Sequence, residues 1–150
     1  MRTSVVGLAG LAFSCTSEPK KPDMTRRLSG HPAESAVAPV PNAVLSPEGW
    51  AFIGNADMTA WAGPWGISFA SNLPPHPNGL GLWTEDQFIE TLRTGTHLGV
   101  GRSVLPPMPW PAYRNMSDED LRAVYAYWKT LPPIPNLVPK PVSPEVARGD

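Results

Sequence analysis

The stretch SDEDLRAVYAYWKTL, residues 117–131, carries the clearest structural signal in this 150-residue sequence. Ser117 is a favourable helix N-cap, and the three acidic residues that follow it suit the positive end of a helix dipole. Apolar residues then recur at three- and four-residue spacing up to Leu131, and Pro132 and Pro133 follow. The pattern predicts an amphipathic helix over 117–131 that ends at the proline pair.

A second helix is predicted over 84–94. Thr84 and Gln87 stand at the spacing of a capping box, and Gly95 is a suitable C-terminal stop. Most of the remaining chain favours loops, because its 20 prolines and 13 glycines interrupt regular elements. Two or three residues within 65–69 are compatible with a short strand. The expected fold class is therefore mainly α, with two clear helices and long Pro/Gly-rich loops.

The two ends of the sequence have their own character. Residues 1–15 have the features of an export signal, with a short apolar run behind Arg2 and a small residue before Cys15. They resemble a bacterial lipoprotein signal, in which Cys15 would become the lipidated N-terminus; a misplaced start of translation is the alternative. The Pro-rich residues 16–47 predict an extended wrapping segment or linker, and residues 140–150 a rigid or disordered tail.

Charge and cysteine usage exclude several classes of function. The 12 basic and 13 acidic side chains nearly cancel, and no basic stripe follows the chain, which argues against nucleic-acid binding. With Cys15 as the single cysteine, the chain can form no internal disulfide and no Cys-rich zinc or iron–sulfur cluster by itself. Ser68 and Ser71 lack the glycine-flanked setting of a hydrolase nucleophile, so a hydrolase is not supported.

The stretch LPPMPWP, residues 105–111, lies between the two predicted helices. Prolines on both sides of Met108 hold the backbone extended, so the loop presents one thioether, a soft neutral metal ligand. A methionine among prolines also serves as core filler, and this alternative remains open. Met116 is a competing candidate, but it directly precedes the Ser117 cap and is placed to pack on Leu121.

An ordered set of short stretches closely resembles the c-type cytochrome domains of bacterial dehydrogenase electron-acceptor subunits. The matching stretches are PDMTRRLSGHP (22–32), GISFASNL (66–73), GLGLWTE (79–85), FI (88–89), LRTG (92–95), PMP (107–109), YRNMSDEDL (113–121) and YAY (125–127). Their order and spacing both match, over roughly residues 22–139.

The resemblance implies a small cytochrome c-like domain at 48–139 that holds haem c, with Met108 as the distal iron ligand. It also implies an electron carrier or accessory subunit rather than a catalyst. Its partners would be redox proteins, such as a dehydrogenase and a respiratory acceptor. The location would be periplasmic or on the outside of the bacterial inner membrane, and the lipoprotein-like residues 1–15 would add a membrane tether through the N-terminus. The six tryptophans would then line a core organised around the porphyrin; a sugar-stacking surface is the alternative.

One departure from that family is large. The family attaches haem through a C-x-x-C-H motif whose histidine binds the iron, and this sequence has no such motif; Cys15 falls where it would stand. The attachment site is thus expected to be truncated or degenerate. His31, His76 and His97 are substitute ligands or ordinary surface and hydrogen-bonding residues. The alternative function is a haem-free, membrane-tethered interaction module descended from a cytochrome c domain.

Overall fold

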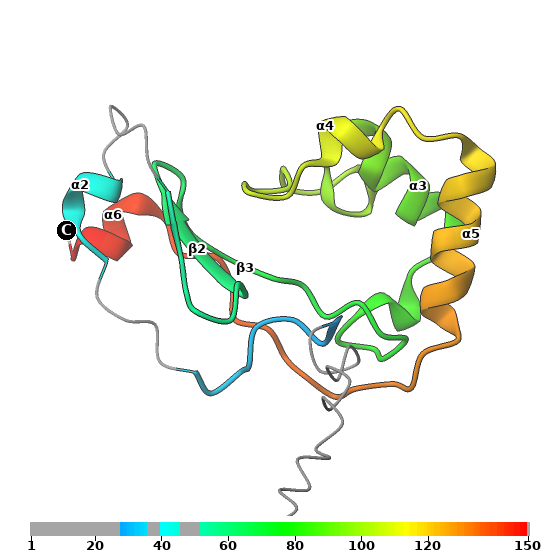
Figure 1. The fold of residues 1–150 in the computed structure, drawn as a ribbon, viewed down its shortest axis with the longest axis horizontal. Helices are drawn as coiled ribbons and strands as arrows, with labels where there is room; N and C mark the ends of the chain where they lie inside the picture. Colours follow the sequence, from blue (N-terminus) through cyan, green and yellow to red (C-terminus); the bar gives the residue numbers. More distant parts are fainter. Residues whose placement is uncertain (1–27, 36–39, 46–51, 150) are drawn as a thin grey trace, which may run out of the picture.

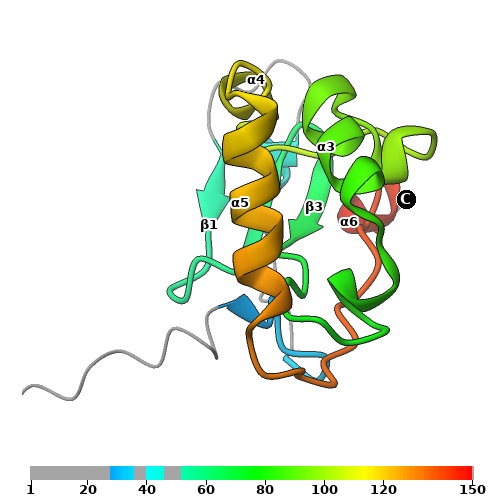
Figure 2. The same ribbon diagram turned by 90° about the vertical axis from the view of Figure 1, so that its right-hand side faces the viewer.

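The computed structural model describes residues 28–35, 40–45 and 52–149. Helices α3, α4 and α5 form one half of the molecule, and a small sheet with helices α2 and α6 forms the other (Figure 1). In the perpendicular view α5 lies in front of the strands, so the two halves face each other (Figure 2). Among the described residues, no helix has the length and apolar character required to cross a bilayer.

The helical half follows the sequence expectations closely. Helix α3 spans Glu85–Thr94, with the Thr84–Gln87 capping box formed in both directions and Gly95 in the left-handed conformation at its end. Helix α5 spans Asp118–Lys129, and the Ser117 hydroxyl accepts a hydrogen bond from the Asp120 amide at 3.1 Å. Both predicted helices are confirmed, and their ends agree with the prediction to within two residues. The agreement is close because the capping signals involve residues that are near one another in the sequence.

Three short elements complete this half. The 3₁₀ turns η1 (Leu80–Leu82) and η2 (His97–Gly99) flank α3, and α4 (Trp110–Tyr113) precedes α5. Helix α3 packs against η2, α4 and α5. This half therefore centres on α3.

The protein also contains a small β-sheet, so the expected mainly α fold class is only partly correct. Strands β1 (Ile53–Gly54), β2 (Ala60–Gly63) and β3 (Gly66–Phe69) pair antiparallel in the order β1-β2-β3. β3 agrees with the short strand predicted within 65–69. β1 has only two residues, and β2 reads Ala-Trp-Ala-Gly without a β-branched residue, so both strands give little signal in the sequence.

The C-terminal residues are part of this second half. Val142 and Ile67 exchange two backbone hydrogen bonds, of 2.8 and 2.9 Å, along the free edge of β3. Helix α6 (Pro144–Arg148) then packs against β3 and the short helix α2 (Asn42–Leu45). Val142 and helix α6 are thus docked on the sheet, unlike the rigid or disordered extension expected from the sequence.

The buried apolar residues in the described part of the chain form two separate clusters. The helical cluster contains Leu80, Phe88, Leu92 and Leu121, and the sheet cluster contains Leu45, Ala62 and Ile67. A domain of this size usually has one continuous core. Here the described residues divide their apolar contacts between the two halves.

Candidate functional site

The loop that carries Met108 lies between η2 and α4 of the helical half and contacts the sheet through Pro106. Met108 itself is 37% exposed and belongs to neither buried cluster of the described residues. Its amide donates to the Leu105 carbonyl at 3.3 Å, which closes a turn across the proline pair. Met108 therefore does not serve as core filler in the described residues. Its role as a ligand stays a prediction.

The loop is attached to the sheet through Ser68. The Ser68 hydroxyl donates to the Pro106 carbonyl at 2.5 Å, and the indole Nε1 of Trp65 donates to the same hydroxyl oxygen at 3.2 Å. Ser68 is only 5% exposed. A part-buried chain of two hydrogen bonds, centred on the buried Ser68, thus runs from Trp65 to the loop, two residues before Met108.

Ser68 lies on the face of β3 that is turned away from the sheet cluster. Neighbouring residues of a strand point to opposite faces, and Ile67 and Phe69 both pack with that cluster. Trp61 is the register partner of Ser68 on β2 and shares its face. We call Trp61, Trp65 and Ser68 the aromatic face of the sheet; its contact with Pro106 directs it toward the helical half.

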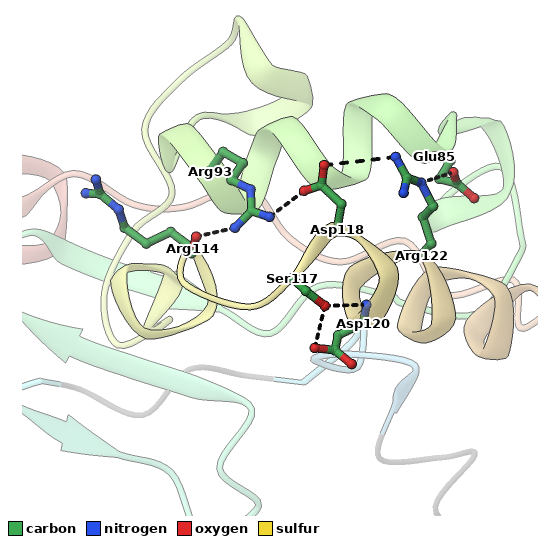
Figure 3. A network of polar contacts seen from close by, with 7 residues as sticks. All are labelled: Glu85, Arg93, Arg114, Ser117, Asp118, Asp120 and Arg122. Atoms are coloured by element: carbon green, nitrogen blue, oxygen red, sulfur yellow. Dashed lines mark hydrogen bonds and ion pairs between the residues drawn. The ribbon is translucent and has the colours of Figure 1, made fainter.

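The other end of the loop is held by α3. A Cβ on Gly95 would meet the Trp110 ring at 2.3 Å, so the indole lies directly on this glycine at the end of α3. The Arg93 guanidinium donates to the Arg114 carbonyl and, at 2.5 Å, to the Asp118 carboxylate (Figure 3). The segment that follows Met108 is thereby fixed against one helix.

Charged groups extend this attachment to α5. Arg122 contacts Glu85 at 3.2 Å and Asp118 at 4.0 Å, as Figure 3 shows. The hydrogen bond from Arg93 holds the pKa of Asp118 below its ordinary value. Because these groups are exposed, the contacts orient the two helices more than they stabilise the fold.

Met116 has the packing role expected from the sequence. It directly precedes the Ser117 cap and packs, half-buried, against the cluster that contains Leu121. Such a contact fixes the angle at which the chain enters α5. Of the two methionines on either side of α4, Met108 has the larger exposed fraction.

The three histidines lie in different surroundings. His31 is 2% exposed, its Nδ1 lies 2.9 Å from the Thr59 hydroxyl, and its ring packs 4.8 Å from the Phe69 ring. Since Phe69 and Ser68 project from opposite faces of β3, His31 lies on the other side of the sheet from the Met108 loop. Burial lowers the pKa of His31, so the buried ring favours the neutral form.

His97 and His76 lie in the helical half. The His97 ring meets the Trp83 ring edge-on at 4.9 Å, and burial and Arg102 lower the pKa of His97. His76 Nδ1 accepts from the Asn78 amide at 3.1 Å. Within the described part of the chain, no three His, Cys, Asp or Glu side chains gather as a metal site.

A haem group fits these residues on one side only. The Met108 thioether is a donor that suits haem iron, and its loop reaches the sheet through the contact of Pro106 with Ser68. The opposite ligand and the two thioether bonds have no counterpart, because C-x-x-C-H is absent from the sequence. Cys15, the predicted lipidation site, lies outside the described residues.

Sequence reasoning missed Ser68 and Arg93. Ser68 stood out only as a candidate nucleophile, although a serine between apolar residues of a strand also signals a buried hydrogen bond. Arg93 gave no separate signal, since an arginine in the last turn of a helix is expected there in any case. The Pro106 carbonyl that Ser68 binds and the two groups that Arg93 binds lie 38, 21 and 25 residues away in the sequence.

The protein is similar to subunits of bacterial dehydrogenases. It is 33% identical over 86 residues to a nicotinate dehydrogenase subunit of Pseudomonas putida, 57% of this chain and 7% of that protein. It is 38% identical over 66 residues to the cytochrome c subunit of the quinone alcohol dehydrogenase of Gluconobacter oxydans, 43% of this chain and 14% of the relative. It is 36% identical over 72 residues to the fructose dehydrogenase cytochrome subunit of Gluconobacter japonicus, a region that covers 47% of this chain and 15% of the relative.

These matches cover a small part of each relative. Each aligned region spans less than a fifth of the curated relative's length. No family model matches the chain. The homologues of this protein thus include cytochrome c subunits of bacterial dehydrogenases, at modest identity over part of the chain.

Proposed function

We propose that this protein is an electron-transfer module of cytochrome c type, an accessory subunit rather than a catalyst. Met108 is its distal iron ligand, and its partners are a dehydrogenase and a respiratory acceptor on the periplasmic side of the inner membrane. The observation that carries the proposal is the Met108 loop, fixed between the halves with its thioether outside both described clusters. The similarity to cytochrome subunits of dehydrogenases supports it.

The divided core also supports a bound planar group. Few apolar residues are buried in either half of the described chain, and the aromatic face is turned toward the Met108 loop. A porphyrin offers a large apolar surface, and burial of such a surface contributes about 25 cal/mol per Å². Bound haem would supply one-electron redox chemistry, while Met108 would favour the reduced state.

A haem-free interaction module is the second candidate. It is favoured by the absence of C-x-x-C-H and by the capping and charge contacts with which the described residues hold their helices together. In that case the similarity records descent, and a lipid on Cys15 would tether the module to a membrane.

Haem binding separates the two candidates. The full chain is expressed together with haem-maturation machinery, and separately mixed with free haem after purification. The first candidate predicts a Soret band and sharp reduced visible bands in at least one preparation. Met108→Ala should then lower the reduction potential, because the thioether stabilises ferrous iron, whereas Met58→Ala should not.

Met58 is a suitable control because it is 60% exposed and lies in the turn between β1 and β2. A folded protein without haem absorption in both preparations contradicts the electron-transfer proposal and favours the interaction module. A bound haem whose potential is unaffected by Met108→Ala contradicts the ligand assignment alone.

A further inference from the structure

The hydroxyl of Ser68 is placed to control the position of Met108. It is the buried link in the hydrogen-bond chain from Trp65 to the Pro106 carbonyl. Because Trp65 donates to the Ser68 oxygen, the hydroxyl hydrogen is free to point at Pro106. The order of donors and acceptors is therefore set from the sheet toward the loop.

The surroundings of Trp65 fix this direction. A Cβ on Gly63 would meet the Trp65 ring at 2.5 Å, so the indole packs directly on the last residue of β2. The Phe52 ring is tilted against the Trp65 ring, with 6.2 Å between the ring centroids. The donor that orients Ser68 is thus itself positioned by β2 and by an aromatic neighbour.

The chain just before the loop is also held, by a hydrogen bond from the Val104 amide to the Gly95 carbonyl at 2.8 Å, but that contact leads to the end of α3 and not to the sheet. Residues 106, 107 and 109 are prolines without an amide hydrogen, so the backbone offers only carbonyls there. Ser68 binds one of these carbonyls, and the Arg93 and Trp110 contacts act only after Met108. Ser68 is therefore the contact that joins the sheet to the proline side of the loop.

We infer that Ser68 is a positioning residue, whose hydrogen bond to Pro106 fixes the Met108 thioether relative to the aromatic face of the sheet. The inference deepens the proposed function, since a fixed thioether is what a stable distal ligand requires. It concerns the position of the sulfur atom and can be tested without haem.

The test uses oxidation of methionine by hydrogen peroxide in the full, folded chain. Peroxide transfers one oxygen atom to the thioether sulfur and leaves water, and the rate follows the accessibility of the sulfur. Met108, Met58 and Met116 are followed separately by mass spectrometry of proteolytic fragments. Met58 is already 60% exposed and reports the chemistry, whereas half-buried Met116 reports loosening of the helical cluster.

Ser68→Ala should accelerate oxidation of Met108 and leave Met58 and Met116 unchanged. Because Met108 is 37% exposed in the intact protein, full exposure limits the gain to about threefold. Trp65→Phe keeps an aromatic side chain, although a smaller one, and removes the indole donor, so it should increase the oxidation rate of Met108 less than Ser68→Ala does. Ser71→Ala changes an exposed serine of the same segment and should have no effect.

An unchanged Met108 rate in Ser68→Ala, with the protein folded, overturns the inference. Equal acceleration at all three methionines also overturns it, because Ser68 would then support the whole fold rather than the loop. Neither result depends on haem uptake, so failure of this inference is distinguishable from failure of the proposed function.

Discussion

His31 shows how one residue links burial to pH. Its ring is enclosed by the sheet half, its Nδ1 contacts the Thr59 hydroxyl, and its Nε2 has no hydrogen-bond partner among the described residues. Burial lowers the pKa of His31 below its ordinary value of 6.5, although Ser35 and Asp57 act in the opposite direction. Protonation of this ring in the folded state would place a charge where little solvates it.

We predict that the protein loses stability as the pH falls from 7 to 5.5. Below pH 6.5 the unfolded chain binds a proton that the folded His31 does not, so the free energy of unfolding decreases until the lower folded pKa is reached. Each such histidine contributes at most about 1.4 kcal/mol per pH unit. Urea unfolding at several pH values measures the slope.

Two histidine variants test which residues cause the pH dependence of the free energy of unfolding. His31→Gln should flatten it, and His97→Gln should remove a further part, because burial lowers the pKa of His97 as well. A slope that is unchanged in His31→Gln would mean that the ring titrates normally in the folded protein. Their joint replacement should leave stability almost constant across this range.

At the scale of elements, α3 connects most of the helical half. Its first turn is closed by the Thr84 capping box, and its last turn holds the Met108 loop through Arg93 and through Gly95 beneath Trp110. Gly95 has a φ of +69°, a conformation that side chains with a Cβ rarely adopt. A single glycine thus ends the helix and admits the indole.

Gly95→Ala is predicted to destabilise the protein by about 3 kcal/mol, from the left-handed backbone and from the clash with Trp110 together. Gly149→Ala is the matched control, because Gly149 has a φ of +82° but no atom within 4 Å of a new Cβ. It should cost about 1 kcal/mol or less. Urea unfolding measures both, and equal losses would contradict the close packing of Trp110 on Gly95.

At the scale of the whole molecule, polar contacts tie together the segments that run between the two halves. Asn136 donates to the Ser29 and His31 carbonyls, and Asn72 donates to the Ile134 and Asn136 carbonyls. The Ser68–Pro106 hydrogen bond joins the halves through the loop. Because the described apolar clusters share no residue, changes inside one should reach the other only weakly.

We therefore predict that Phe88→Leu in the helical cluster and Ile67→Val in the sheet cluster have additive effects on stability. Each should cost about 1 kcal/mol, and the double variant should match the sum within about 0.5 kcal/mol. The control pair, Phe88→Leu with Leu121→Val, lies within one cluster and should deviate from additivity. Coupling between Phe88 and Ile67 as strong as in the control pair would show a continuous core.

The sequence alone determined the features that depend on neighbours along the chain. Thr84, Gln87 and Gly95 predicted the ends of α3, and Ser117 predicted the start of α5, because capping involves atoms only a few residues apart. The packing of Met116 at the start of α5 followed from the same kind of local spacing.

The tertiary structure decided what depends on distant residues. The pairing of Val142 with Ile67, the burial of His31 and the bond from Ser68 to Pro106 each join segments at least 28 residues apart. No periodicity encodes such contacts, because their free energy arises only when the chain has folded and excluded water from both partners. The prolines around Met108 made its thioether a candidate ligand, which stays a prediction, but they gave no sign of the sheet residue that holds the loop.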